Sequence, residues 1–350
     1  MKKSLIWDFS DYEYTEKKYA REPIIEIMPD GSLVCVMLTG GTTEPHNKNI
    51  VAICRSNDGG ETWSAPEILF QHKERGVWAT EIYTGFEKPM MVLYTYNADC
   101  PYKELQTFVS YTDDSGKTWS QPRHIASYAN GLCLRRGVKM SNGETLFPVY
   151  YTEVYDGFGS FPEFGVTGFW KGTRHMCGVV VTDDEGKSYK PFGNIEVDLN
   201  NYPKEVGSPH MWEPNCIEVD DGHIIMYIRC SCSRYIVMSE SFDYGRTWSK
   251  PIETDIPNAD SKMTLFKIGK KVFLVSNLTG DITYEGRTRL SIQSGTDGKN
   301  WEFVTFVDGE DAQRFYPHTA IDEKNRIVYL AYEDGVKHFL NKYTFEELGI

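Results

Sequence analysis

The sequence has little that would place it in a membrane or on nucleic acid. No apolar run approaches the roughly 18 residues that a membrane helix needs. The 50 acidic residues outnumber the 37 basic ones and give a net charge of −13, which opposes binding to nucleic acid. We therefore expect neither membrane nor nucleic-acid partners.

The sequence also has no pattern typical of a metal site or of a secreted protein. Its eight cysteines are scattered without a CxxC pair, no Cys/His spacing suits tetrahedral zinc, and HExxH and GxSxG are absent. We expect no metal and no cofactor. Scattered free thiols are typical of a reducing compartment. The N-terminal stretch has only a brief apolar run, Leu5 to Trp7, unlike a secretory signal. These features predict a cytoplasmic protein.

Long segments of helical period are lacking, and a repeated motif is present instead. Five segments share the pattern Ser/Thr-x-Asp-x-Gly-x-Thr-Trp, some of them imperfectly, and their starts lie 53–70 residues apart. The segments are Ser56–Trp63, Thr112–Trp119, Thr182–Tyr189, Ser241–Trp248 and Ser294–Trp301. In each motif the Asp and Ser/Thr side chains can bond backbone amides, Gly permits the turn, and the Trp packs as the next strand begins. The motifs are therefore predicted to be scaffold.

Short runs rich in β-branched and aromatic residues lie between the motifs, bounded by Gly, Pro, Asp and Asn. The predicted strands include Leu33–Leu38, Ile50–Cys54, Met90–Tyr96, Ile224–Arg229, Val272–Ser276 and Ile327–Tyr332. Six periods of about 60 residues with four strands each predict an all-β fold, a six-bladed β-propeller with four-stranded antiparallel blades. We expect residues 1–350 to form this one domain. The last blade lacks a motif, so we expect Leu5–Phe9 to complete it.

Hairpin turns fix which strand ends share a face. A three-residue loop at Asp220–Gly222 sets Arg229 opposite Glu213, and a two-residue loop makes them diagonal neighbours, so either loop brings them together. The face opposite these turns collects the starts of first strands and the loops after second strands. The residues expected on it are Arg21, Glu44, His46, Arg135, Arg136, His210, Glu213, Arg229, Arg287, Arg289, Tyr316 and His318.

These segments resemble the sialidase superfamily over nearly the whole chain. The repeated motifs resemble its Asp boxes, and Ala20–Ile24 is similar to its Arg-Ile-Pro stretch, with Glu22 in place of Ile. The segment from Glu213 to Arg229 resembles the part that carries the family's catalytic Glu and second Arg. Tyr316 resembles the nucleophile. Arg287 is the best match for the third Arg, with Arg289 as the alternative.

The resemblance implies a retaining exo-glycosidase that releases a terminal acidic sugar, sialic acid first. Arg21, Arg229 and Arg287 would clamp the substrate carboxylate, because a guanidinium bonds both of its oxygens. Tyr316 would be the nucleophile, and Glu213 would accept its proton. A tyrosine suits a sialoside because the carboxylate on the anomeric carbon would repel an attacking carboxylate.

The sequence departs from the family at the general acid. The family has an Asp in the upper loop of the first blade, and Thr39–Asn49 contains none. Glu44, which we take as the catalytic candidate, or His46 would then have to donate the proton to the leaving group, or the acid lies elsewhere in the sequence. Further substrate contacts are expected from His46, Arg136, His210, Trp212 and His318.

Two other functions stay open. A polysaccharide lyase or another glycosidase acting on uronate-containing glycans would use an Arg to neutralise the carboxylate, and Tyr316 with His318 or His210 as base and acid. A non-catalytic propeller that binds glycan or protein would need none of these roles, and the missing Asp favours it. The expected partner of an enzyme is an acidic carbohydrate or oligosaccharide. The sequence leaves open whether the chain forms a homo-oligomer.

Overall fold

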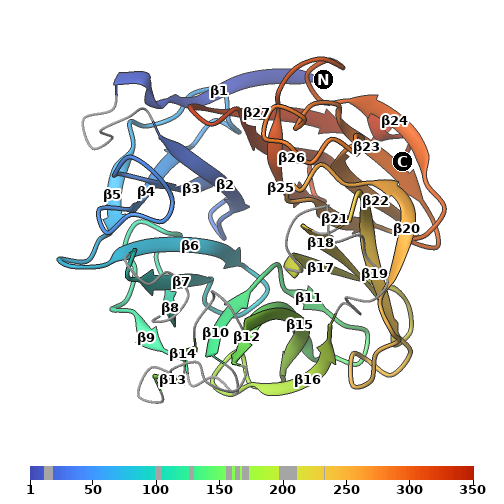
Figure 1. Ribbon diagram of the computed structural model, residues 1–350. Helices are drawn as coiled ribbons and strands as arrows, with labels where there is room; N and C mark the ends of the chain where they lie inside the picture. Colours follow the sequence, from blue (N-terminus) through green and yellow to red (C-terminus); the bar gives the residue numbers. More distant parts are fainter. Residues whose placement is uncertain are drawn as a thin grey trace. The chain divides into compact units, whose positions relative to one another are not determined.

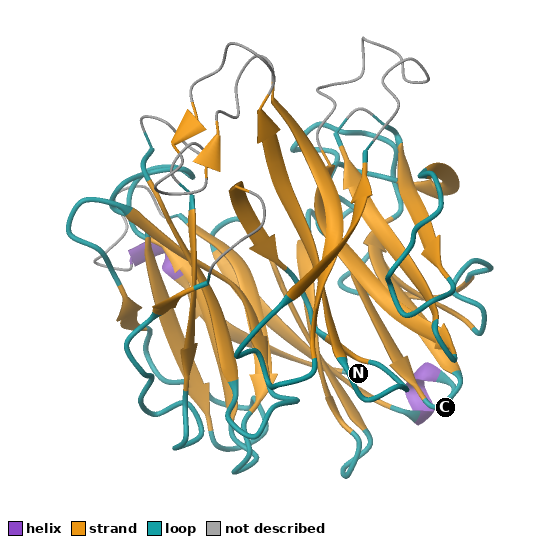
Figure 2. Cartoon of the chain, turned by 90° about the horizontal axis from the view of Figure 1, so that it is seen from below, coloured by secondary structure: helices purple, strands orange, loops and turns teal. Residues whose placement is uncertain are grey.

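A computed structural model describes residues 1–11, 19–98, 105–125, 130–154, 160–161, 166–167, 173–196, 211–231 and 233–350. These residues form strands joined by loops, and the helices among them are two short 3-10 turns, η1 (Phe9–Asp11) and η3 (Glu346–Leu348) (Figure 2). The chain divides into two units. Unit 1 comprises Met1–Leu132, Gly157–Lys171 and Tyr316–Ile350, and unit 2 comprises Cys133–Asp156 and Gly172–Phe315.

Unit 1 contains three four-stranded antiparallel sheets, and their strands are labelled in Figure 1. The first holds β2 (Ala20–Ile27), β3 (Leu33–Thr39), β4 (Ile50–Ser56) and β5 (Glu67–Phe70). The second holds β6 (Gly76–Tyr83), β7 (Met90–Tyr96), β8 (Gln106–Tyr111) and β9 (Arg123–His124). The third holds β1 (Lys2–Asp8), β27 (Lys337–Thr344), β26 (Ile327–Glu333) and β25 (Phe315–Asp322) in that order. A two-stranded ribbon pairs β13 (Ser160–Phe161) with β14 (Val166–Thr167).

Unit 2 contains three further antiparallel sheets. The first holds β10 (Asn130–Leu134), which begins in unit 1, then β12 (Thr145–Val154), β15 (Thr173–Thr182) and β16 (Lys190–Ile195), with the short β11 (Val138–Lys139) beside β12. The second holds β17 (Met211–Asp220), β18 (His223–Cys230), β19 (Tyr235–Ser241) and β20 (Ile252–Pro257). The third holds β21 (Thr264–Ile268), β22 (Lys271–Asn277), β23 (Leu290–Gly295) and β24 (Glu302–Phe306). All six predicted strands named above lie within observed strands.

The unbroken apolar sequence of β3 reflects burial on both of its faces. Cys35 and Met37 pack in a cluster with residues of β1, β26 and β27. Val34 and Val36, which alternate with them, pack in a second cluster with residues of β6 and β7. A strand that is covered on both sides has no solvent face for polar residues, so its sequence does not alternate.

The N-terminal segment completes the last sheet, as predicted. Strand β1 pairs antiparallel with β27, from Lys2 opposite Lys342 to Asp8 opposite Lys337. Ile6 and Phe9 are both buried in the cluster that also contains Leu340. Because the first and last strands share one sheet, this sheet is closed by residues more than 300 positions apart in sequence.

The repeated motifs form the expected turns, and all five glycines have positive φ, from 70° to 83°. In the first motif the Ser56 hydroxyl accepts from the Gly60 N–H at 2.9 Å, and Asp58 accepts from the N–H and hydroxyl of Thr62 at 3.0 and 2.6 Å. The motif of Thr112–Trp119 repeats these bonds. Its Thr118 hydroxyl and amide hold the pKa of Asp114 at about 2.

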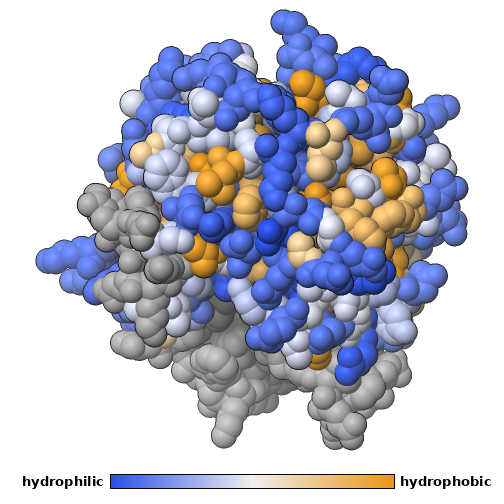
Figure 3. Space-filling model, turned by 90° about the horizontal axis from the view of Figure 1, so that it is seen from above, coloured by the Kyte–Doolittle hydropathy of each residue, from blue (hydrophilic) through white to orange (hydrophobic). Residues whose placement is uncertain are grey.

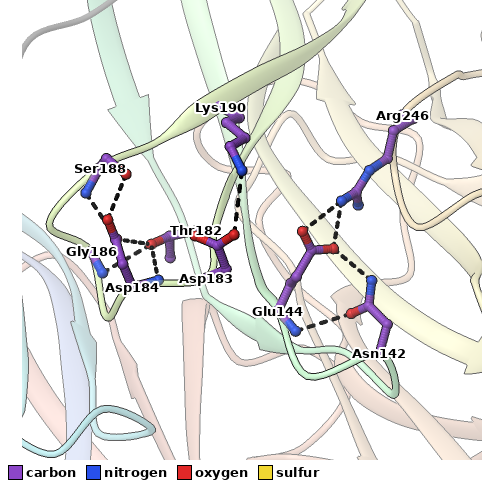
Figure 4. A network of polar contacts seen from close by, with 9 residues as sticks. All are labelled: Asn142, Glu144, Thr182, Asp183, Asp184, Gly186, Ser188, Lys190 and Arg246. Atoms are coloured by element: carbon purple, nitrogen blue, oxygen red, sulfur yellow. Dashed lines mark hydrogen bonds and ion pairs between the residues drawn. The ribbon is translucent and has the colours of Figure 1, made fainter.

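Unit 2 shows how a motif turn lies beside a hairpin turn (Figure 4). Asp184 accepts from the Ser188 N–H and hydroxyl at 2.9 and 2.6 Å, as Asp58, Asp114 and Asp243 do in their motifs. Arg246, from the next motif along the chain, donates to Glu144 Oε1 at 2.7 Å, next to the hairpin turn at Asn142. The motifs therefore form the predicted turns, and their role as scaffold stays a prediction. On the face in Figure 3 hydrophilic residues cover much of the coloured part, with smaller hydrophobic areas between them.

Candidate active site

Three of the predicted catalytic and clamp segments share one unusual backbone feature. Glu22, Glu213 and Tyr316 each precede a proline and have φ of +54°, +47° and +54°. Non-glycine residues seldom adopt this conformation, and such strain is found most often at functional sites. The strand register also skips at two of these positions, between Arg21 and Ile24 and between Trp212 and Asn215. A bulge of this kind re-aims the side chains beside it.

In unit 1 Arg21 is held by a buried carboxylate on β26. Its Nη1 donates to Glu333 Oε2 at 3.3 Å, and the Glu333 side chain is fully buried while that of Arg21 keeps 16% exposure. Glu333 also accepts from the N–H of Glu22 at 2.7 Å and of Gly335 at 3.1 Å. The carboxylate therefore ties the start of β2 to the end of β26, and it orients the guanidinium through a charge-assisted bond.

Glu22, which stands where the sialidase stretch has Ile, is buried and bonded. Its Oε2 accepts from Trp78 Nε1 at 2.9 Å, and both residues are at least 94% buried. A buried carboxyl without such a donor would carry a large desolvation cost. The indole of β6 therefore compensates for the polar replacement.

The loop after β3 carries both candidates for the missing acid. Glu44 is half-buried, and its Oε2 accepts from the Tyr19 hydroxyl at 3.1 Å. His46 Nδ1 instead accepts from the Lys48 N–H at 3.0 Å, which is a local turn contact. The buried Asn49 side chain donates to the Thr43 carbonyl at 3.1 Å and so fixes the loop. Glu44 and His46 both stay candidates for the proton donor.

His318, expected to contact substrate, lies in the core of unit 1. Its Nε2 is 3.2 Å from Glu81 Oε1, and the two side chains are each only 2% exposed. Tyr316, two residues earlier on β25, is half-buried. The substrate contact of His318 stays a prediction.

In unit 2 Glu213 and Arg229 lie together, as predicted. Glu213 Oε2 and Arg229 Nη1 are 3.0 Å apart, and their side chains are 6% and 12% exposed. Of the two loops considered, the three-residue one is wrong and the two-residue one is confirmed, because Asp220 pairs with His223; the bulge in β17 then sets Arg229 opposite Trp212. Glu213 and Arg229 are still in contact, because Glu213 directly follows Trp212, the residue opposite Arg229.

Asp260 brings the second and third arginines together. Arg229 Nε donates to Asp260 Oδ1 at 2.8 Å, and Arg287 Nη2 donates to the Asp260 backbone carbonyl at 2.7 Å. Burial acts to raise the pKa of Asp260, but the Arg229 charge and hydrogen bonds outweigh it and hold that pKa below its usual range. Arg289 instead pairs with Glu310, and its side chain is 43% exposed. The geometry therefore favours Arg287 as the third arginine.

The remaining predicted contacts lie as follows. Trp212 is half-buried, donates to the Ser231 hydroxyl at 3.1 Å and meets the Tyr150 ring edge-on at 5.6 Å. Arg136 is half-buried, while Arg135, its neighbour, is 98% buried. His210 lies outside the described residues.

The described residues contain neither a metal-binding cluster nor a membrane-spanning helix. No group of three or more His, Cys, Asp or Glu side chains there could hold a metal ion. Among those same residues, no helix has the length and apolar character required to cross a bilayer.

The chain belongs to the BNR repeat-like domain family, which matches residues 21–329. Among solved structures, it is similar to the Hadza microbial sialidase Hz136, with a TM-score of 0.75 at 15% identity over 98% of this chain and 68% of that one. It is also similar to a protein of unknown function from Dyadobacter fermentans, with a TM-score of 0.68 at 17% identity over 98% and 97% of the two chains. These likenesses show the fold. The predicted all-β, six-bladed propeller of the sialidase type is confirmed.

A relative found by sequence carries a functional name. The chain is 22% identical over 331 residues to a protein called sialidase from Bacteroides fragilis. The match covers 82% of this chain and 54% of the relative, so the chain spans about half the length of that curated protein.

Four polar partners of the predicted residues were not singled out from the sequence: Tyr19, Trp78 and Glu333 in unit 1, and Asp260 in unit 2. Trp78 and Asp260 lie on or just before the first strands of the second and fifth repeats, the two repeats whose first strands gave no candidate. The equivalent position in every repeat was therefore a signal that could have found them. Glu333 ends a second strand, as Arg229 nearly does, so the same alignment of repeats indicates it.

Proposed function

We propose that the protein is a retaining exo-glycosidase that releases a terminal acidic sugar, and sialic acid is the sugar we propose. The observation that carries this proposal is the convergence of Arg229 and Arg287 on Asp260, with Glu213 on the same guanidinium. Arg229 and Arg287 balance the charges of Glu213 and Asp260, and the planar guanidinium fork is the group that suits a substrate carboxylate. Membership of the BNR repeat-like family and likeness to proteins named sialidase support the same class.

In the proposed reaction Tyr316 Oη attacks the anomeric carbon while Glu213 takes the phenolic proton. Glu44 protonates the departing glycosidic oxygen, which leaves with the aglycone. Glu44 then removes a proton from water, which attacks the same carbon. Tyr316 leaves and recovers its proton, and two displacements retain the anomeric configuration. Arg21, Arg229 and Arg287 hold the carboxylate throughout.

Turnover of an aryl α-sialoside tests this proposal. The unaltered protein is expected to release the phenol, and Tyr316→Phe is expected to reduce kcat at least about 100-fold because the nucleophile is lost. Tyr329→Phe is the matched control, since Tyr329 lies on β26 in the core beside Gly59 and outside the proposed machinery. Equal turnover by Tyr316→Phe and the unaltered protein would refute the role of Tyr316. If the unaltered protein turned over no acidic-sugar glycoside, the proposal that it is a glycosidase would be refuted.

A further inference from the structure

One tyrosine contacts two groups that have separate tasks in the proposed reaction. Tyr19 lies just before β2, and its hydroxyl donates to Glu44 Oε2 at 3.1 Å. The Arg21 guanidinium carbon lies 5.1 Å from the centre of the Tyr19 ring. The same side chain therefore joins the proposed proton donor to the first arginine of the carboxylate clamp.

The tyrosine itself is fixed from the backbone side. The Thr39 hydroxyl, at the end of β3, donates to the Tyr19 carbonyl at 2.7 Å. Thr39 directly precedes the loop that carries Glu44, and Ala20 pairs with Thr39 across the hairpin. The backbone of Tyr19 is thus attached to the base of that loop, so its ring is set relative to both strands.

The hydroxyl is suited to donate at any working pH. Burial first, and then the Glu44 carboxylate, raise the pKa of Tyr19 far above its ordinary value, while Arg21 acts in the opposite direction. The phenol therefore stays protonated. A neutral O–H directed at a carboxyl oxygen restricts the rotation of that carboxyl group, which a loop residue would otherwise retain.

We propose that Tyr19 is a positioning residue that orients Glu44 through its hydroxyl and Arg21 through its ring, so that proton donation and carboxylate binding are aligned. This inference rests on the proposed function. It goes beyond that function because it assigns two separable effects to one side chain that has no chemical role in the reaction as written.

Two variants separate the two effects. Tyr19→Phe removes the hydroxyl and keeps the ring beside Arg21, whereas Tyr19→Leu removes both. The assay uses two sialosides, one with an aryl leaving group that departs without protonation and one with an alkyl leaving group that requires it. Tyr19→Phe is expected to lower kcat about 10-fold on the alkyl sialoside, and by less than about twofold on the aryl one, because only the former depends on Glu44.

Tyr19→Leu is expected to show the same loss in kcat and, in addition, a KM about fivefold higher on both substrates, because the cation–π contact to Arg21 is gone. Tyr329→Phe is again the control and should change neither constant, and urea unfolding midpoints check that each variant is folded. Should Tyr19→Leu fail to fold, the comparison of Tyr19→Phe on the two substrates still decides the hydroxyl's role.

Three results would overturn the inference. One is a Tyr19→Phe enzyme with unchanged kcat on the alkyl sialoside, and another is an equal loss on both sialosides, which a purely structural role would give. The third is a folded Tyr19→Leu enzyme with an unchanged KM. Failure of the proposed function gives a different pattern, since the unaltered protein would then turn over neither substrate, and the inference would fall with it.

Discussion

Replacing Glu333 with glutamine tests how strongly one buried carboxylate holds the start of β2. Glu333 is fully buried and accepts three bonds, from the N–H groups of Glu22 and Gly335 and from Arg21 Nη1. Glutamine has nearly the same shape, but it is neutral and presents an NH₂ group in place of one oxygen. Whichever side the NH₂ group occupies, at least one of the buried donors loses its acceptor.

The magnitude follows from these contacts. A buried N–H without a partner costs about 1–3 kcal/mol. Removing one member of a buried ion pair costs about 3–5 kcal/mol, and the 16% exposure of the Arg21 side chain places this pair at the lower end of that range. The two effects overlap, so we expect the free energy of unfolding to fall by about 3 kcal/mol.

Urea unfolding of both proteins at pH 7 measures this difference. Glu61→Gln is the matched control, because Glu61 pairs with Lys2 and Lys342 at the surface with 36% of its side chain exposed. A surface pair contributes less than about 1 kcal/mol. If Glu333→Gln were no less stable than Glu61→Gln, the reasoning about the buried carboxylate would be refuted.

The remaining predictions concern other parts of the molecule. Deleting residues 1–9 is expected to cost about 3–5 kcal/mol in urea unfolding, since Ile6 and Phe9 are buried; an unchanged midpoint would contradict the role of β1. Arg287→Lys is expected to raise KM about 10-fold on an aryl sialoside because lysine lacks the planar fork, whereas Arg289→Lys should change it less than about twofold; the reverse order would reassign the third arginine. Burial lowers the pKa of His338 from 6.5 to about 3, so the unfolded chain binds more protons between these pH values. Stability should therefore fall as the pH drops from about 6.5 to 3, and less steeply in His338→Phe; parallel pH profiles for the two proteins would show that His338 is not responsible.

The fold could be predicted because its signals are local and repeated. Each motif specifies its own turn through an Asp, a hydroxyl and a glycine, as the bonds of Asp58 show, and five copies give the period. The closing strand β1 was also predictable, because the last repeat lacked a motif. The register near Glu213 was not, since the bulge before Pro214 depends on a positive φ that the residue type does not indicate.

The site could be predicted in part. The proximity of Glu213 and Arg229 follows from hairpin pairing. A one-residue error in the length of the hairpin loop still leaves the two residues as neighbours. The role of Asp260 does not follow from pairing, because it lies in the connection between β20 and β21 and reaches Arg229 through its side chain. The Tyr19–Glu44 contact joins a strand start to a loop, and a side-chain contact across a loop has no period that a sequence pattern could reveal.

The stereochemistry of the first-formed product tests the central claim most directly. Proton NMR, recorded during the first minutes of aryl α-sialoside hydrolysis and before mutarotation, identifies the anomer released. Double displacement at Tyr316 predicts the α-anomer of the free sugar. Initial release of the β-anomer, or of an unsaturated sugar by elimination, would contradict the account.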